Sequence, residues 1–162
     1  MNSRDIVSGT TGLVVGGILT WLLKNKLKRV ISIARYATKS SALEPIKMVL
    51  VVRPDVRMSS GKLAAQCAHA AVSSYAAAKE YDPQLVAMWE STGQAKIVVS
   101  GDKTGEMELY SLAEKAKQFN IVTAIIRDAG RTQLAAGTPT VLGMGPAKAK
   151  DLDNVSGHLR LY

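Results

Sequence analysis

From about residue 45 onward, the chain alternates between short apolar runs and longer stretches in which apolar residues recur at helical spacing. Met48–Val52 is apolar at every position, which is typical of a central strand covered on both faces. The alanine-rich stretch Lys62–Glu80 has the periodicity of an amphipathic helix. Strands are predicted over residues 48–52, 96–100, 121–127 and 140–144, helices over 62–80, 83–91, 109–119 and 146–153, and a last extended piece over 159–162.

Cap and turn residues separate these elements. Ser59 or Ser60 is placed to cap the first helix. Asp82 is the expected cap of the second helix, with Pro83 at its first position, and Pro146 is expected to open the last helix. About a dozen residues join the third and fourth strands, too few for a helical crossover, so these strands should be antiparallel neighbours. The pattern predicts an α/β fold on a mixed sheet of about four strands.

The amino-terminal segment has a different character. Residues 6–23 carry no charge, and at about 1.5 Å per residue such a helix reaches about 27 Å, close to the roughly 30 Å hydrocarbon core of a bilayer. Lys and Arg residues cluster directly after it, and this order favours an uncleaved anchor over a cleaved signal peptide. The polar stretch at residues 32–44 argues against the alternative that residues 6–23 form a buried helix of the domain. The predicted organisation is a membrane anchor at 1–23, a basic linker at 24–44 and a folded domain at 45–162.

The charge of the chain lies mostly in this segment. The formal net charge is +8, and residues 1–44 contribute +5 of it, from seven basic and two acidic residues. The folded part is only mildly cationic, so we expect any nucleic acid to be held locally and not by a broad basic face. The single cysteine, Cys67, excludes an intramolecular disulfide and a thiolate zinc cluster, which fits a reducing compartment.

Two groups of polar residues could carry chemistry. The first lies in the glycine-broken loop that begins at Asp128, directly after an apolar run, where binding residues are often positioned by a rigid scaffold. Its alternative interpretation is a capped turn with Gly130 and Gly137 at positive φ. The second is a stripe on the first helix, and its alternative interpretation is an ordinary solvated face. The stripe comprises Lys62, Gln66, His69 and Ser73, opposite an apolar face of Leu63, Ala64, Cys67, Ala68, Ala71 and Tyr75.

The position of Lys62 at a helix N-terminus favours binding of an anion or a developing oxyanion, because backbone N–H groups and the helix dipole point the same way. A Cys67–His69 nucleophilic pair is improbable, since two residues apart on a helix point in nearly opposite directions. Cys67 is expected to be a small buried residue. His69 remains a secondary candidate, and His158 is expected at the surface.

These stretches resemble the archaeal and eukaryotic type of peptidyl-tRNA hydrolase. The resemblance covers nearly all of residues 47–162 and rests on four motifs in order. They are Lys-Met-Val-Leu-Val-Val-Arg-Pro-Asp, then Gly-Lys-Leu-Ala-Ala-Gln-Cys-Ala-His-Ala-Ala, then Asp-Ala-Gly-Arg-Thr-Gln with Thr-Pro-Thr-Val-Leu-Gly-Met-Gly-Pro, and finally Gly-His-Leu-Arg-Leu-Tyr. The resemblance implies a three-layer α/β/α sandwich on a mixed four-stranded sheet. It also implies hydrolysis of the ester between peptide and tRNA, with no metal and no other cofactor.

The active-site positions that the resemblance implies fall on Lys62, Gln66, Asp128, Thr132 and Thr140. In the hypothesis that follows, Asp128 orients or deprotonates a water molecule, and Lys62 with the helix N–H groups stabilises negative charge. Gln66, Thr132 and Thr140 hold the network through hydrogen bonds. Which residue is the general base stays open. Arg57, Lys103 and Arg131 are candidates for contacts with tRNA phosphates.

Animal members of the family carry a similar hydrophobic amino-terminal stretch and are associated with mitochondria, and some with apoptotic signalling. The resemblance therefore implies a mitochondrial location, with the outer membrane as first choice and the cytosol as second. The basic residues after the apolar stretch predict that the domain faces the cytosol. The expected partners are peptidyl-tRNA and, through residues 6–23, a membrane. A second hypothesis is a membrane-tethered module on the same fold that binds a protein partner, with or without activity. The oligomeric state, including a dimer, stays open.

Overall fold

The computed structural model describes residues 20–28, 44–102, 104–131 and 134–162. The chain divides into two compact units, residues 1–43 and 44–162. In the first unit, residues 20–28 are helical. The remainder of the predicted membrane segment and most of the basic linker lie outside the described residues. Within the described ranges, no helix combines the length and the apolar character needed to cross a bilayer.

The second unit is built on one mixed sheet with the strand order β3-β4-β1-β2-β5. Strand β1 runs parallel to β2, whereas β4 runs antiparallel to both of its neighbours, β1 and β3. The predicted antiparallel pairing of the third and fourth strands is therefore confirmed. The strands are β1 (Ile46–Val52), β2 (Lys96–Ser100), β3 (Thr123–Arg127), β4 (Pro139–Lys148) and β5 (Arg160–Leu161).

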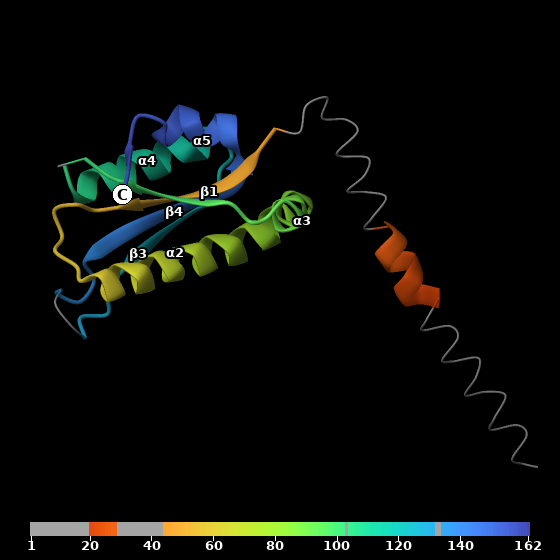
Figure 1. The fold of residues 1–162 in the computed structure, drawn as a ribbon, viewed down its shortest axis with the longest axis horizontal. Coiled ribbons are helices and arrows are strands. Elements are labelled where there is room, and N and C mark those ends of the chain that lie inside the picture. Colours follow the sequence, from red (N-terminus) through yellow and green to blue (C-terminus); the bar gives the residue numbers. More distant parts are fainter. Residues whose placement is uncertain (1–19, 29–43, 103, 132–133) are drawn as a thin grey trace, which may run out of the picture. The chain divides into compact units, whose positions relative to one another are not determined.

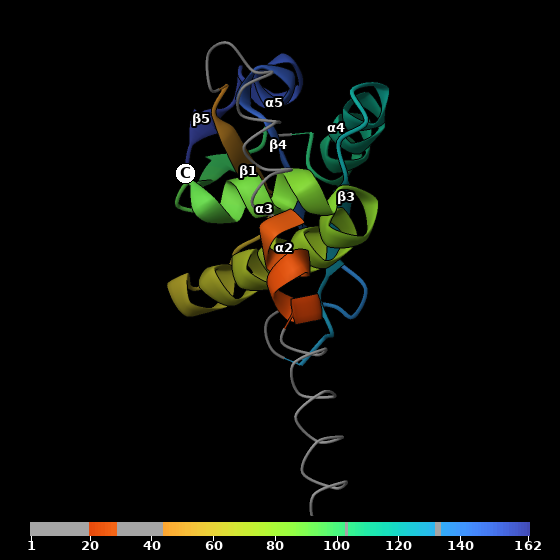
Figure 2. The ribbon, with the colours of Figure 1, turned by 90° about the vertical axis from the view of Figure 1, so that its right-hand side faces the viewer.

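Helices cover both faces of this sheet, as Figure 1 and the turned view in Figure 2 show. Helices α2 and α3 lie on one face, and α4 and α5 lie on the other. The main hydrophobic core includes Leu109 and Leu112 of α4 and Leu152 of α5, packed on residues of β1 and β4. The helices are α2 (Ser60–Tyr81), α3 (Pro83–Ser91), α4 (Glu106–Gln118) and α5 (Ala149–Ser156).

The predicted caps are confirmed where local chemistry dictates them. The Ser59 hydroxyl accepts a hydrogen bond from the Lys62 N–H at 3.4 Å and caps α2. The Asp82 carboxylate accepts from the N–H groups of Gln84 and Leu85, at 3.2 and 2.9 Å, and Pro83 occupies the first position of α3. These side chains satisfy donors that have no partner within the helix.

The sheet has five strands, so the expectation of about four was wrong. The additional strand is β5, in which Leu161 pairs with Val99 and Arg160 with Ser100. The N–H of Tyr162 also donates to the carbonyl of Val98, at 3.1 Å. An uncovered strand edge presents unpaired N–H and C=O groups, and this short pairing covers part of the edge of β2. The extended piece predicted over 159–162 thus becomes a strand.

The prediction that Pro146 opens the last helix was wrong. Strand β4 continues through Pro146 to Lys148, the Gly145–Pro146 peptide bond is cis, and α5 begins at Ala149. The register of β1 and β4 shifts between Lys47 and Val49, opposite this segment. A proline has no N–H for a regular ladder, and an irregularity in the pairing is where a sheet accommodates it.

The predicted orientation of the first helix was also wrong. The residues of α2 that are buried are Gln66, Ala70, Ser74 and Ala78, whereas Ala64 and Ala68 of the predicted apolar face are exposed. Cys67, expected to be buried, is only partly so. The buried line lies over Gly143 of β4, where an added Cβ would stand 2.2 Å from Ser74 Oγ and 2.9 Å from the Ala70 carbonyl oxygen. This close approach turns the Gln66 side of the helix toward the sheet.

The topology brings the polar segments to one edge of the sheet. Because β4 is antiparallel to β1 and to β3, the carboxyl ends of β1 and β3 and the start of β4 share that edge. Asp128 follows the end of β3, and Thr140 lies at the start of β4. Helix α2 begins a few residues after β1 ends, so Lys62 reaches the same edge. The fold therefore joins the two groups of polar residues.

Candidate active site

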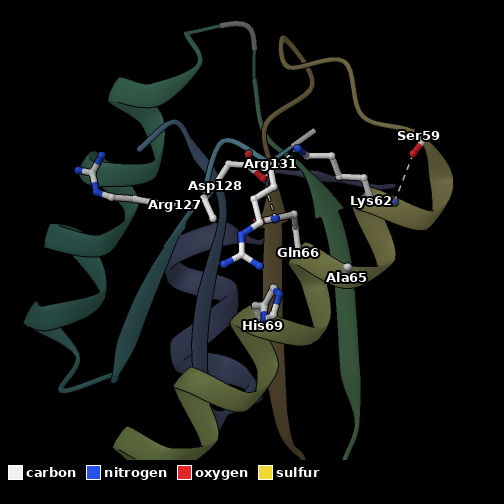
Figure 3. Close-up of a pocket in the computed structure, with 9 residues that line it drawn as sticks. Ser59, Lys62, Ala65, Gln66, His69, Arg127, Asp128 and Arg131 are labelled. Carbon is white, nitrogen blue, oxygen red and sulfur yellow. Dashed lines mark hydrogen bonds and ion pairs between the residues drawn. The ribbon is translucent and has the colours of Figure 1, made fainter. Parts of the chain in front are cut away.

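A buried carboxylate lies at the centre of the site. Asp128 is 6% exposed, and its Oδ2 lies 2.9 Å from the Lys62 ammonium nitrogen, whose side chain is 8% exposed. The same oxygen accepts a hydrogen bond from Gln66 Nε2 at 3.1 Å. The other oxygen, Oδ1, accepts from the backbone N–H of Gly130 at 2.9 Å. Figure 3 shows Lys62 and Gln66 projecting from α2 toward this carboxylate.

Thr140 extends the network to the start of β4. Its hydroxyl is fully buried, 2.7 Å from Gln66 Oε1 and 3.2 Å from the carbonyl oxygen of Ile126. With Gln66 Oε1 engaged by Thr140, the amide presents its nitrogen to Asp128. Four of the five predicted active-site residues, Lys62, Gln66, Asp128 and Thr140, thus form one connected network.

Backbone hydrogen bonds join the two ends of the loop that follows β3. The N–H of Asp128 donates to the Thr138 carbonyl at 2.8 Å, and the N–H of Gly137 donates to the Asp128 carbonyl at 2.7 Å. Gly130 and Gly137 have φ values of +75° and +85°. The predicted positive-φ turns are therefore present. They occur together with the side-chain network, so the turn and the candidate site are not alternatives.

The network opens onto a cleft of about 450 Å³. Helix α2 and its cap form one wall, and the segment after β3 forms the other. Of the nine described residues that line it, only Asp128 carries a carboxylate, and in the described part of the chain no cluster of His, Cys, Asp and Glu could hold a metal ion. The cleft is lined by Ser59, Lys62, Ala65, Gln66, His69, Arg127, Asp128, Ala129 and Arg131.

The surroundings of Asp128 favour its charged form. The hydrogen bond from Lys62 and the one from Gly130 N–H lower the pKa of Asp128 below its usual value, and they outweigh the opposing effect of burial. The group is therefore ionised at neutral pH. A carboxylate with a lowered pKa is a weak base, so this site is better suited to orienting a water molecule than to removing its proton unaided.

The remaining predicted residues differ in their placement. His69 and Arg131 are exposed and line the cleft. Arg57 is exposed on the connection between β1 and α2, outside the lining of this cleft. Thr132 and Lys103 lie outside the described residues.

Sequence reasoning missed Arg127, which also lines the cleft. Its guanidinium donates to the Gly137 carbonyl oxygen at 2.8 Å and to the hydroxyl of Tyr110. It points away from Asp128 toward α4 (Figure 3). Its place directly before Asp128 was the available signal, but Arg127 directly follows an apolar run, and the sequence predicts it only as the end of a strand.

The fold and the cleft define the class of protein: an α/β/α sandwich with a buried carboxylate, an ammonium group and hydrogen-bonding side chains at one edge of its sheet. The sequence model of the family described as "Peptidyl-tRNA hydrolase PTH2" matches residues 46–162. The chain belongs to this family. The resemblance inferred from the four motifs is therefore confirmed.

Individual relatives agree with this assignment. The chain is 48% identical over 116 residues to "Peptidyl-tRNA hydrolase 2, mitochondrial" of Homo sapiens, which covers 72% of this chain and 64% of the human protein. It is 50% identical over 115 residues to "Probable peptidyl-tRNA hydrolase 2" of Drosophila melanogaster, covering 71% of this chain and 61% of that protein. It is 47% identical over 119 residues to "Peptidyl-tRNA hydrolase" of Halobacterium salinarum, covering 72% of this chain and 100% of that protein. The match thus spans less than two thirds of the human and fly proteins.

Proposed function

We propose that this protein hydrolyses the ester bond of peptidyl-tRNA and releases the peptide and free tRNA. The observation that carries the proposal is the buried network of Lys62, Asp128, Gln66 and Thr140 at the cleft, in a chain of this family. Ester hydrolysis requires a positioned water molecule and stabilisation of the oxyanion that forms when water attacks. The network offers a group for each of these tasks.

In this mechanism, Asp128 accepts a hydrogen bond from the attacking water and orients it toward the ester carbon. Lys62, near the N-terminus of α2, stabilises the negative charge that develops on the carbonyl oxygen. Gln66 and Thr140 keep the Asp128 carboxylate in place. Thr132 is proposed to complete this network, and His69 is a secondary candidate on the wall of the cleft.

The tRNA is proposed to bind through phosphate contacts near the cleft. Arg131 is the best-placed candidate because it is exposed and lines the cleft beside Asp128. Arg57 is exposed on a neighbouring connection, and together with Lys103 it would extend the contact along the tRNA backbone. Binding of this kind depends on charge and little on sequence, which suits an enzyme that acts on many tRNAs.

The test of activity uses the full-length chain and a peptidyl-tRNA with an N-blocked aminoacyl group. We expect Asp128→Asn and Lys62→Ala each to lower kcat by roughly 100-fold or more, as loss of a water-orienting or oxyanion-stabilising group does. Asp151→Asn and Lys150→Ala are matched controls on α5, on the opposite face of the sheet, and should leave turnover unchanged. Full turnover in both site variants would refute the assignment of these residues.

We further propose that residues 1–44 attach the protein to the mitochondrial outer membrane, with the domain facing the cytosol. The support is the uncharged stretch 6–23 followed by basic residues, and the word "mitochondrial" in the names of the human and bovine relatives. A fusion of residues 1–44 to a fluorescent protein should label mitochondria, and the fluorescent part should be digested by protease added to intact organelles. A diffuse cytosolic signal would refute the anchor, and protection from the protease would refute the orientation.

A further inference from the structure

Arg53 lies at the same edge of the sheet as the candidate site but is not among the residues that line the cleft. Arg53 follows the end of β1, and its side chain is 11% exposed. Its Nε and Nη2 donate to the two carboxylate oxygens of Asp55, at 3.1 and 2.6 Å. Its Nη1 also lies 3.7 Å from the carboxylate of Glu106. The charge of Arg53 is thus balanced by two acids, and its fork-shaped group is held by a two-point contact.

The remaining bonds of Arg53 reach the main chain of β4. Its Nη1 donates to the Pro139 carbonyl at 3.0 Å, and its backbone N–H donates to the Thr140 carbonyl at 3.1 Å. Arg53 therefore holds both residues at the start of β4. Because the Thr140 hydroxyl bonds to Gln66, which in turn bonds to Asp128, the position of this main chain determines the geometry of the whole network.

Arg127 contacts the chain just before β4, at Gly137. It donates to the carbonyl of Gly137, whose N–H donates to the Asp128 carbonyl. The Arg127 guanidinium lies 5.9 Å from the centre of the Tyr110 ring. The Tyr110 hydroxyl lies 3.1 Å from Glu106 Oε1 and accepts from Arg127. Glu106, near Arg53, therefore links the two arginines on the side of the sheet that carries α4.

We propose that Arg53 is a positioning residue for hydrolysis, which fixes the start of β4 so that Thr140 and Gln66 hold Asp128 in its reactive position. The inference rests on the proposed function. Three of the five N–H donors of the guanidinium are used within the protein. A lysine at this position retains the charge but cannot reproduce a planar two-point contact together with a third bond. The shape of Arg53, and not its charge, is therefore what the reaction requires.

The kinetic test compares Arg53→Lys, Thr140→Val and the double variant in the full-length chain, with peptidyl-tRNA as substrate. We expect Arg53→Lys to lower kcat about ten-fold, with KM and its dependence on salt changed less than two-fold. Because Arg53 acts through Thr140, the kcat of the double variant should lie within about two-fold of the kcat of Thr140→Val. Arg160→Lys, an exposed arginine on β5, is the matched control and should behave as the parent protein.

Three kinetic results would overturn the proposal. A raised KM with a weaker salt dependence would make Arg53 a phosphate contact. Losses of kcat that multiply in the double variant would make Arg53 and Thr140 independent. An unchanged kcat per folded molecule in Arg53→Lys, with only a lower Tm, would reduce Arg53 to a purely structural role.

A measurement without substrate separates this inference from the proposed activity. The unfolding equilibrium constants of the parent protein, Arg53→Lys, Thr140→Val and the double variant form a double-mutant cycle. Coupling through the Pro139–Thr140 main chain predicts that the fold-change of the double variant differs from the product of the fold-changes of the single variants. If the parent protein does not hydrolyse peptidyl-tRNA but the cycle shows coupling, the proposed function fails while the bracing of Thr140 by Arg53 stands. If the fold-changes multiply, the bracing itself is refuted.

Discussion

The contact between α2 and Gly143 leads to the sharpest prediction for stability. An alanine Cβ at Gly143 would lie 2.2 Å from Ser74 Oγ and 2.9 Å from the Ala70 carbonyl oxygen, distances that real Cβ atoms do not show. Gly143 is not among the positive-φ residues, so alanine meets no backbone strain there, and the clash alone sets the cost. Overpacking of this kind costs about 1–3 kcal/mol. We expect Gly143→Ala to lower the unfolding free energy by about 2 kcal/mol and Tm by roughly 5–10 °C.

The other side of this contact predicts the opposite sign. Ser74 Oγ is the one buried side-chain polar atom among the described residues that has no hydrogen-bond partner. Burying an unsatisfied hydroxyl costs about 1–3 kcal/mol, so Ser74→Ala should raise the unfolding free energy by about 1 kcal/mol. In the double variant Ser74→Ala/Gly143→Ala, the 2.2 Å contact disappears while the contact with the Ala70 carbonyl remains. Ser74→Ala should therefore recover part of the loss caused by Gly143→Ala.

Urea unfolding of the full-length chain, followed by near-ultraviolet circular dichroism, measures these differences at constant slope m. Gly143→Ala should also lower kcat, because α2 carries Lys62 and Gln66 and must move away from the sheet to admit the methyl group. A Gly143→Ala protein as stable as the parent would refute the close packing of α2 on β4. A Ser74→Ala protein that is less stable would mean that the hydroxyl has a partner.

Two further predictions concern charge. The pKa of Asp128 is lowered by Lys62 and Gly130, so its contribution to stability is fully present above the unfolded-state pKa of about 3.9 and is lost as the pH falls through the folded-state pKa. The difference in unfolding free energy between the parent protein and Asp128→Asn should therefore shrink on acidification below about pH 4, and a difference that grows would contradict the assigned environment. Arg131→Ala should weaken tRNA binding and reduce the slope of log K against log salt by about 1, and an unchanged slope in a filter-binding titration would exclude a phosphate contact.

Local signals in the sequence predicted the elements well. Ser59 and the Asp82–Pro83 pair cap helices as expected, because a side-chain oxygen and a missing N–H act within one turn of the chain. Tertiary context decided the rest. Pro146 has the local chemistry of a helix start, yet the pairing of β4 with β1 extends past it. Strand β5 has two residues and is defined only by the free edge of β2.

The face of α2 could not be predicted for a related reason. Alanine occurs on nearly every side of this helix, so periodicity does not identify the side that is buried. That choice is made by Gly143, more than sixty residues away in the chain. The candidate site was easier to predict, because a polar loop at a strand end and a lysine at a helix start are both visible in the sequence. Their 2.9 Å contact, and the part played by Arg127, depend on the order of the strands.

The hydrogen bonds around Asp128 also determine how many positions remain for a substrate. A carboxylate has about four acceptor sites, two on each oxygen. Lys62 and Gln66 occupy both sites of Oδ2, and the N–H of Gly130 occupies one site of Oδ1. The described residues thus leave one acceptor site of the carboxylate, on Oδ1. In the proposed mechanism, the attacking water therefore donates its hydrogen bond to Oδ1, because Lys62 and Gln66 occupy Oδ2.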